Sequence, residues 1–110
     1  MYRVRSILVL FLLSVMHAGV AHAQWVQTNG PGGGIIVGFA VSDTNIFTGT
    51  GGGGVFLSTN NGTSWTETGL TNTDVCALAI SGTNLFAGTW GGGVWRRPIF
   101  DIINEAKGVR

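Results

Sequence analysis

The chain contains Val41-Ser42-Asp43-Thr44-Asn45-Ile46-Phe47-Thr48-Gly49-Thr50, and 39 positions later it contains Ile80-Ser81-Gly82-Thr83-Asn84-Leu85-Phe86-Ala87-Gly88-Thr89. The correspondence continues from residues 52–56 to residues 91–95. Both copies consist of short runs of apolar and β-branched residues, separated by glycine, serine and asparagine, which favours strands joined by tight turns. The repeat therefore predicts an all-β chain built from two copies of one unit.

The first copy divides into four expected strands, and the second copy contains the first three of them. They are residues 36–41, 45–49, 55–58 and 64–68 in the first copy, and 75–80, 84–88 and 94–97 in the second. Residues 25–28 align with 65–68 and are expected to be the last strand of a preceding unit. A repeat of about 40 residues with four strands is typical of a propeller blade. Since a propeller has about four to eight blades, we expect roughly two four-stranded antiparallel blades of an incomplete propeller.

The two glycine-rich links are expected to be hairpin turns. Gly49-Thr50-Gly51-Gly52-Gly53-Gly54 formally matches a dinucleotide-binding loop, but that motif requires a helix directly after it. Here an expected strand follows, and the glycine run recurs at residues 91–93 inside the repeat. In the turn that joins the first two strands of each copy, Asp43 exchanges with Gly82. Both residue types accept a positive φ, which we expect at these positions.

Residues 1–23 are expected to be a cleaved signal peptide. Arg3 and Arg5 precede an apolar run of about ten residues, and Ala21-His22-Ala23 forms a small-x-small cleavage site. The alternative is a membrane anchor, for which the apolar run is short. The protein is then secreted, periplasmic or on the cell surface, with no stable membrane span after cleavage.

The composition of residues 24–110 argues against several functions. Four basic and five acidic residues give a net charge of about −1, so there is no basic surface for nucleic acid. No histidine remains, and Cys76 is the single cysteine. Without a base, Cys76 is expected to be a buried small hydrophobic residue rather than a nucleophile. We expect no catalytic residues, metal site or cofactor.

Residues 58–65 carry a more specific pattern. Ser58, Asn60, Gly62 and Trp65 resemble the Asp-box (BNR) repeat S-x-D-x-G-x-x-W, with asparagine in place of the usual aspartate. In this structural motif the Asx side chain is expected to accept backbone N–H bonds. The glycine adopts a left-handed conformation, and the tryptophan buries its indole between the sheets.

The resemblance covers residues 25–98 and extends to sialidases, sortilin-type receptors, photosystem II assembly factors and secreted bacterial repeat proteins. It implies a propeller fold rather than one activity. Sialidases use an arginine triad, a tyrosine nucleophile with a glutamate partner and an aspartate acid. Residues 24–110 contain no tyrosine, and their arginines are clustered at positions 96, 97 and 110 rather than spread over several blades. Sialidase chemistry is therefore not transferred to this chain.

The positions where the copies differ indicate a candidate ligand face. Trp90 replaces Gly51 and Asp74 replaces Ile35, and the antiparallel order places both at the end that carries the glycine hairpins. A carbohydrate or a protein ligand could stack on Trp90 and bond to Asn72, Asp74 or Thr89. In the alternative, Trp90 packs over the glycine hairpin of the neighbouring copy.

The functional expectation is a non-catalytic secreted repeat module that acts as a scaffold or interaction surface. Alternatives are a fragment of a glycoside-acting propeller enzyme or of a sensory receptor, with the functional residues in missing blades. Residues 24–98 form the repeat region, and residues 99–110 form either a short helical tail or a linker. The spacing of Ile99, Ile102, Ile103 and Ala106 fits a helix.

We expect residues 24–110 alone to be marginally stable or to self-associate, because two isolated blades leave sheet faces and edges open. Size-exclusion chromatography with light scattering measures this directly. A stable, well-dispersed monomer would contradict the incomplete-propeller interpretation.

Overall fold

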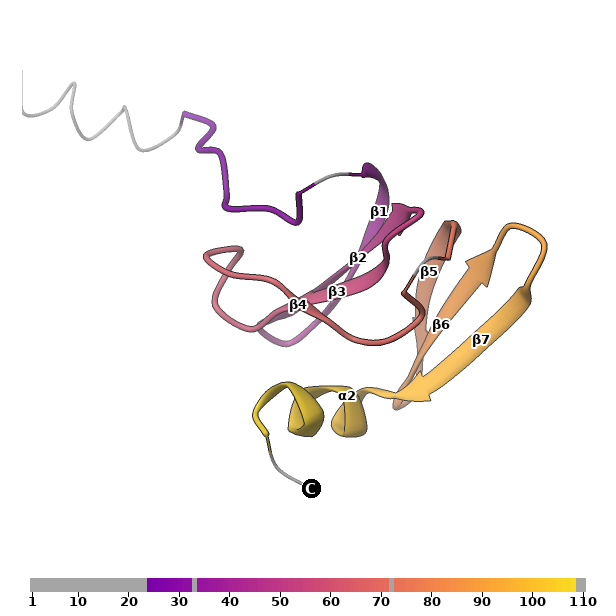
Figure 1. The fold of residues 1–110 in the computed structure, drawn as a ribbon. Coiled ribbons are helices and arrows are strands. Elements are labelled where there is room, and N and C mark those ends of the chain that lie inside the picture. Colours follow the sequence, from indigo (N-terminus) through magenta and orange to yellow (C-terminus); the bar gives the residue numbers. More distant parts are fainter. Residues whose placement is uncertain (1–23, 33, 72, 109–110) are drawn as a thin grey trace, which may run out of the picture.

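The computed structural model describes residues 24–32, 34–71 and 73–108, so the expected signal peptide lies outside the described residues. These residues form two antiparallel sheets and a short helix (Figure 1). Sheet A has the order β1-β2-β3-β4, and sheet B has the order β5-β6-β7. The elements are β1 (Ile35–Ser42), β2 (Asn45–Gly51), β3 (Gly54–Ser58), β4 (Thr66–Glu67), β5 (Val75–Ser81), β6 (Asn84–Thr89), β7 (Gly93–Pro98) and α2 (Ile99–Ala106). The all-β prediction is confirmed.

The two sheets repeat the same register. The first turn closes on Ser42 and Asn45 in sheet A and on Ser81 and Asn84 in sheet B. Asp43 has a φ of 53° and Gly82 has a φ of 58°, which confirms the positive φ expected from their exchange. Each first strand also has a register shift near its start, between Ile36 and Gly38 in β1 and between Val75 and Ala77 in β5.

The glycine-rich links are tight hairpins closed by the same side-chain bond in both sheets. Thr50 Oγ1 donates to the carbonyl of Gly54 at 2.9 Å, and Thr89 Oγ1 donates to the carbonyl of Gly93 at 2.7 Å. Both closing glycines have a φ of 79°. A strand follows each link, so the hairpin interpretation of the glycine run is confirmed.

Each sheet has two faces, because side chains alternate along a strand and paired residues share a face. Equivalent positions of the repeat define a front face and a back face. The front face comprises Phe39, Val41, Ile46, Thr48 and Phe56 in sheet A, and Leu78, Ile80, Leu85, Ala87 and Trp95 in sheet B. The back face comprises Ala40, Phe47, Gly49, Val55 and Leu57 in sheet A, and Ala79, Phe86, Gly88, Val94 and Arg96 in sheet B.

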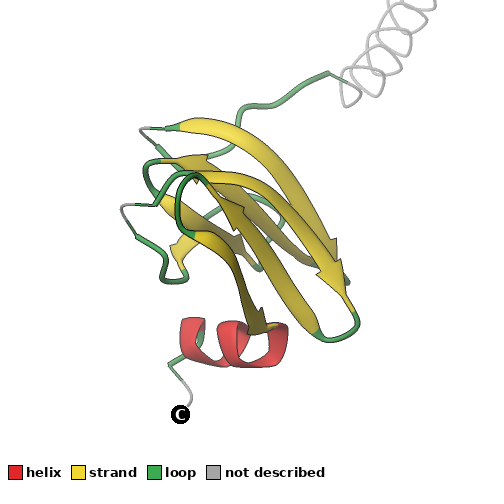
Figure 2. Cartoon of the chain, turned by 90° about the vertical axis from the view of Figure 1, so that its right-hand side faces the viewer, coloured by secondary structure: helices red, strands yellow, loops and turns green. Residues whose placement is uncertain are grey.

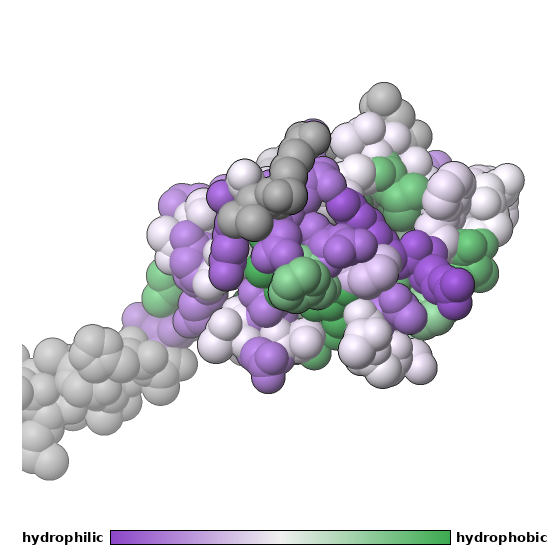
Figure 3. Space-filling view, turned by 90° about the horizontal axis from the view of Figure 1, so that it is seen from below, coloured by the Kyte–Doolittle hydropathy of each residue, from purple (hydrophilic) through white to green (hydrophobic). Residues whose placement is uncertain are grey.

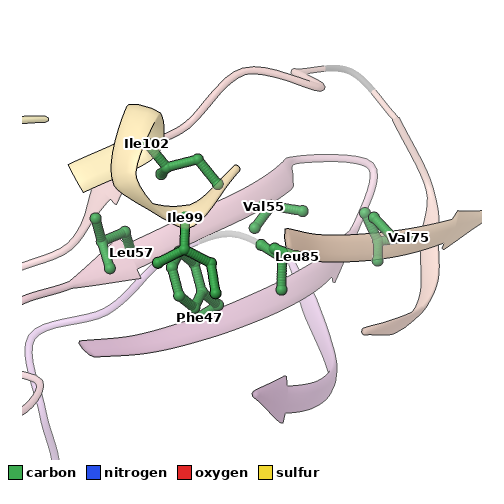
Figure 4. Close-up of a cluster of buried hydrophobic side chains, with 8 residues drawn as sticks. Phe47, Val55, Leu57, Val75, Leu85, Ile99 and Ile102 are labelled. Atoms are coloured by element: carbon green, nitrogen blue, oxygen red, sulfur yellow. The ribbon is translucent and has the colours of Figure 1, made fainter. Parts of the chain in front are cut away.

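The front of sheet B packs on the back of sheet A, with β5 against β1 and β2 (Figures 1 and 2). Phe47, Val55 and Leu57 from the back of sheet A are buried in this contact. Sheet B contributes Leu85 and Ala87, which are also buried, together with Val75 at the start of β5 (Figure 4). The core of the described chain is therefore the layer between two equivalent sheets.

Gly49 lies where the two sheets come closest. A Cβ atom at this position would lie 2.6 Å from Val75 Cγ1 and 3.2 Å from Val37 Cγ2. Such distances are below normal van der Waals contact, so a side chain here would force the sheets apart. In sheet B the equivalent position is Gly88, where the nearest atom to a Cβ is the Ala77 carbonyl oxygen at 4.0 Å.

The helix α2 closes the lower end of the space between the sheets. Ile99 and Ile102 are buried and belong to the same cluster as Phe47, Val55 and Leu57 (Figure 4). The Ile99 N–H donates to the carbonyl of Thr83 at 2.9 Å, which fixes the start of the helix beside the turn of sheet B. Seen from below, this end shows small hydrophobic areas separated by hydrophilic ones (Figure 3). Residues 99–106 thus form the expected helix, and they are part of the packed structure.

The fourth strands differ from the prediction. Residues 64–68 were expected to form one strand, but β4 has only two residues, because only Thr66 and Glu67 pair with β3. Residues 25–28 are not a strand in the described chain, where no neighbouring strand pairs with them. Trp25 and Val26 are exposed.

The expectation that Cys76 is buried is wrong. Its side chain is exposed, because Cys76 occupies the irregular position in β5 between the paired residues Val75 and Ala77. An extra residue in a strand interrupts the alternation of inward and outward side chains. The alternating pattern of the sequence alone therefore does not predict whether the side chain of Cys76 is buried or exposed.

The two equivalent glycines give a matched test of the contact between the sheets. Gly49→Ala is expected to lower the free energy of unfolding by about 1–3 kcal/mol, as overpacking a core does. Gly88→Ala is expected to change it by less than about 0.5 kcal/mol, as at an uncrowded surface site. Urea denaturation at low protein concentration measures both. Equal effects would contradict the packing described for Gly49.

Candidate functional site

Asp74 and Trp90 lie together at the hairpin end of the two sheets. The Trp90 N–H donates to the carbonyl of Asp74 at 2.9 Å. The Gly54 N–H donates to the carbonyl of Thr73 at 3.1 Å. The segment that leads into β5 is therefore bonded to the hairpins of both sheets, which fixes the position of Asp74 between them.

The side chains at this end differ in their exposure and in whether their polar groups are free to bind a ligand. Trp90 is 80% exposed, so the alternative in which its indole covers the hairpin of sheet A does not fit the structure. Asp74 is exposed, and its Oδ1 lies 3.6 Å from the position of a Cβ on Gly52. Thr89 already donates its hydroxyl hydrogen to Gly93, so it holds the hairpin. Asn72 lies outside the described residues.

The turn after β3 is held by a closed set of side-chain hydrogen bonds. Ser58 Oγ, which is fully buried, accepts the N–H of Gly62 at 2.8 Å and donates to Asn60 Oδ1 at 3.1 Å. Asn60 Oδ1 also accepts the N–H of Ser64 at 2.9 Å, and Asn60 Nδ2 donates to Ser64 Oγ at 2.8 Å. The oxygen of Asn60 thus performs the N–H-accepting role expected of an aspartate in this turn.

Gly62 and Trp65 complete this turn. Gly62 has a φ of 87°, and a Cβ there would lie 2.9 Å from Thr28 Cγ2. Trp65 is half-buried and lines a groove on the front of sheet A with Phe39 and Val41. The expectation that its indole lies between the sheets is therefore wrong for the two described sheets, because the front of sheet A faces away from sheet B. Its Nε1 is buried and has no hydrogen-bond partner among the described residues.

The chemistry available to the described residues is limited. Within residues 24–32, 34–71 and 73–108, no three His, Cys, Asp or Glu residues are grouped so that they could hold a metal ion. The space between the sheets, lined by Val55, Leu85 and Trp95 among others, measures about 60 Å³. That volume suits one or two water molecules rather than an organic ligand. In the same ranges, no helix combines the length and apolar character needed to cross a membrane.

Comparison with known proteins identified no relative. No family model matches the chain, and no curated protein or solved structure is significantly similar to it.

The sequence did not predict the role of Arg97. Its Nη1 donates to the carbonyl of Thr68 at 2.9 Å, which connects β7 to the end of β4. Its Nη2 forms an ion pair with Glu105 on α2. Arg97 replaces Ser58 of the first copy, so the difference between the copies marks the position. Its partners are not apparent from the repeat, because Thr68 belongs to the other copy and Glu105 lies after the repeat region.

Removal of the Ser58 hydroxyl tests the turn. Ser58→Ala leaves the buried N–H of Gly62 without its acceptor, which is expected to lower the free energy of unfolding by about 1–3 kcal/mol. Thr59→Ala changes an exposed neighbour and is expected to shift it by less than about 0.5 kcal/mol. Urea denaturation measures both variants. An unchanged midpoint for Ser58→Ala would show that the turn does not depend on this bond.

Proposed function

We propose that the chain is a non-catalytic, secreted β-repeat module of the propeller type that acts as an interaction surface. The stacking of the two sheets supports the propeller type. The front of sheet B packs on the back of sheet A, so successive units have the same orientation, as in repeat architectures in which each unit covers its neighbour. The repeated register and hairpin bonds support the same view.

The exposed indole of Trp90 is the main observation that supports a role in binding. A large aromatic side chain usually buries most of its surface, so an 80% exposed tryptophan on a rigid hairpin suits a ligand contact. The hairpin is held at both ends, by the Thr89–Gly93 bond and by the bond from the Trp90 N–H to the Asp74 carbonyl. The indole is therefore presented without a large loss of backbone entropy on binding.

We infer that the ligand class is carbohydrate. A sugar ring has an apolar face that stacks on an indole and hydroxyl groups that donate to a carboxylate. Trp90 supplies the first contact, and the exposed carboxylate of Asp74, located between the two hairpins, supplies the second. An apolar peptide would use the indole and leave the carboxylate unpaired.

Calorimetry and a panel of neutral and acidic oligosaccharides test this proposal. Trp90→Ala is expected to weaken binding at least about tenfold, which corresponds to about 1.4 kcal/mol or more. Asp74→Asn is expected to weaken it less, since an amide oxygen still accepts hydrogen bonds. Phe100→Ala is the matched control, because Phe100 is a similarly exposed aromatic residue on α2. Equal affinities for Trp90→Ala and the wild type, or binding of no oligosaccharide, would contradict the proposal.

A further inference from the structure

In the described chain, no other sheet covers the front of sheet A or the back of sheet B. The repeat makes the front of sheet A equivalent to the packed front of sheet B, and the back of sheet B equivalent to the packed back of sheet A. The front of sheet A exposes Phe39 and Val41, both 61% exposed, where the equivalent Leu78 and Ile80 of sheet B pack against sheet A. The back of sheet B exposes Val94, 75% exposed, where the equivalent Val55 is buried. Among the described residues, no second sheet packs on either of these faces, and the front of sheet A carries a groove lined by Phe39, Val41 and Trp65.

We propose that a second copy of this chain docks head to tail on the first, with the front of its sheet A on the back of sheet B. This inference does not depend on the carbohydrate site. The match between the faces is close. On the back of sheet B, Ala79, Phe86, Gly88 and Val94 replace Ala40, Phe47, Gly49 and Val55, so aromatic, glycine and small positions are all retained.

Gly88 is the most specific part of this match. At its equivalent, Gly49, the absence of a side chain leaves the space that Val75 of the next sheet occupies. In the described chain nothing lies within 4 Å of a Cβ on Gly88 except the Ala77 carbonyl oxygen at 4.0 Å. The repeat places Ile36 of the incoming copy at this position, since Ile36 is the equivalent of Val75. A glycine with open space above it thus fits the approach of a second copy.

One position on the back of sheet B changes from apolar to charged, and the incoming copy carries an opposite charge at the same end. Arg96 replaces Leu57, and its alkyl stem can cover apolar surface while the guanidinium reaches water. In the internal interface, Leu57 lies near Ile99 at the start of α2 (Figure 4). Within sheet B, the Ile99 N–H donates to the carbonyl of Thr83 in the β5–β6 turn. The equivalent turn of the incoming copy contains Asp43. In the proposed assembly, Asp43 of the incoming copy therefore lies at the same end as Arg96.

The same equivalence assigns a partner to residues 25–28. β4 pairs with β3 through Leu57 and Thr66 and through Phe56 and Glu67. β7 is the terminal strand of sheet B, with β6 on one side only in the described chain. Residues 25–28 are the equivalent of 65–68, and their first two residues are exposed. In the assembly this segment of the second copy becomes the fourth strand of sheet B, with Val26 opposite Arg96 and Gln27 opposite Trp95.

Such an interface joins two different surfaces of each copy. A head-to-tail contact does not close on itself in a dimer, so it continues into a ring or a filament, depending on the rotation between copies. The assembly would complete the units that the described chain leaves open, and it would remove exposed β edges, which otherwise pair nonspecifically.

Association and its dependence on Gly88 test the proposed faces. For protein expressed from the full-length sequence, light scattering and analytical ultracentrifugation are expected to show a mass above that of the monomer that increases with concentration. Gly88→Ala is expected to weaken association at least about tenfold and leave the urea midpoint of the dilute protein unchanged. Gly38→Ala, a strand glycine outside both open faces that also has free space around its Cβ, is expected to associate like the wild type. A wild-type monomer at all concentrations, or equal association of Gly88→Ala and the wild type, would overturn the proposal.

Disulfide trapping tests the strand register. In a Cys76→Ala background, Val26→Cys protein mixed with Arg96→Cys protein is expected to form an intermolecular disulfide, because directly paired residues have suitable Cα separations. Gln27→Cys mixed with Arg96→Cys is the control, since a shift of one residue places the two side chains on opposite faces. Equal or reversed crosslinking would overturn the assignment of residues 25–28. Carbohydrate binding to the Trp90 site is measured separately, so its failure would not affect this result.

Discussion

The described structure depends on the close approach of Val75 to Gly49. Without a side chain at residue 49, the front of sheet B can lie directly on the back of sheet A. This contact buries Phe47, Val55 and Leu57, which form most of the apolar core contributed by sheet A. The strands of neither sheet can bury an apolar face alone, so the two sheets are stable because they cover each other.

The functional surface is a consequence of this stacking. Once the sheets are packed, the hairpins of both lie at one end, and the segment entering β5 bonds to each of them through Asp74 and Thr73. Trp90 is held in an exposed position by the same bond. At the other end, α2 covers the opening with Ile99 and Ile102, and Arg97 connects β7 to both β4 and the helix. One end is thus closed by packing, and the other presents groups that can bind.

Much of the fold could be predicted from the repeat, because the strand segments, the Asp43 and Gly82 turns and the glycine hairpins depend on local patterns. The exposure of Cys76 could not, since it follows from a register irregularity that local patterns do not reveal. The location of Trp65 depended on which sheet lies beside it, which is a tertiary property. The sequence did bring Asp74 and Trp90 together as candidates through the differences between copies, but the use of the Thr89 hydroxyl within its own hairpin required the structure.

A double-mutant cycle between residues 49 and 75 tests the central claim that these two positions set the spacing of the sheets. Gly49→Ala, Val75→Ala and the double variant would be compared by urea denaturation. We predict that Val75→Ala lowers the cost of Gly49→Ala by about 1 kcal/mol, because it removes the Cγ1 atom at 2.6 Å. Part of the cost remains, since Val75 Cβ at 3.1 Å and Val37 Cγ2 at 3.2 Å are still close. Additive effects, within about 0.5 kcal/mol, would contradict the account, because independent sites do not limit each other's packing.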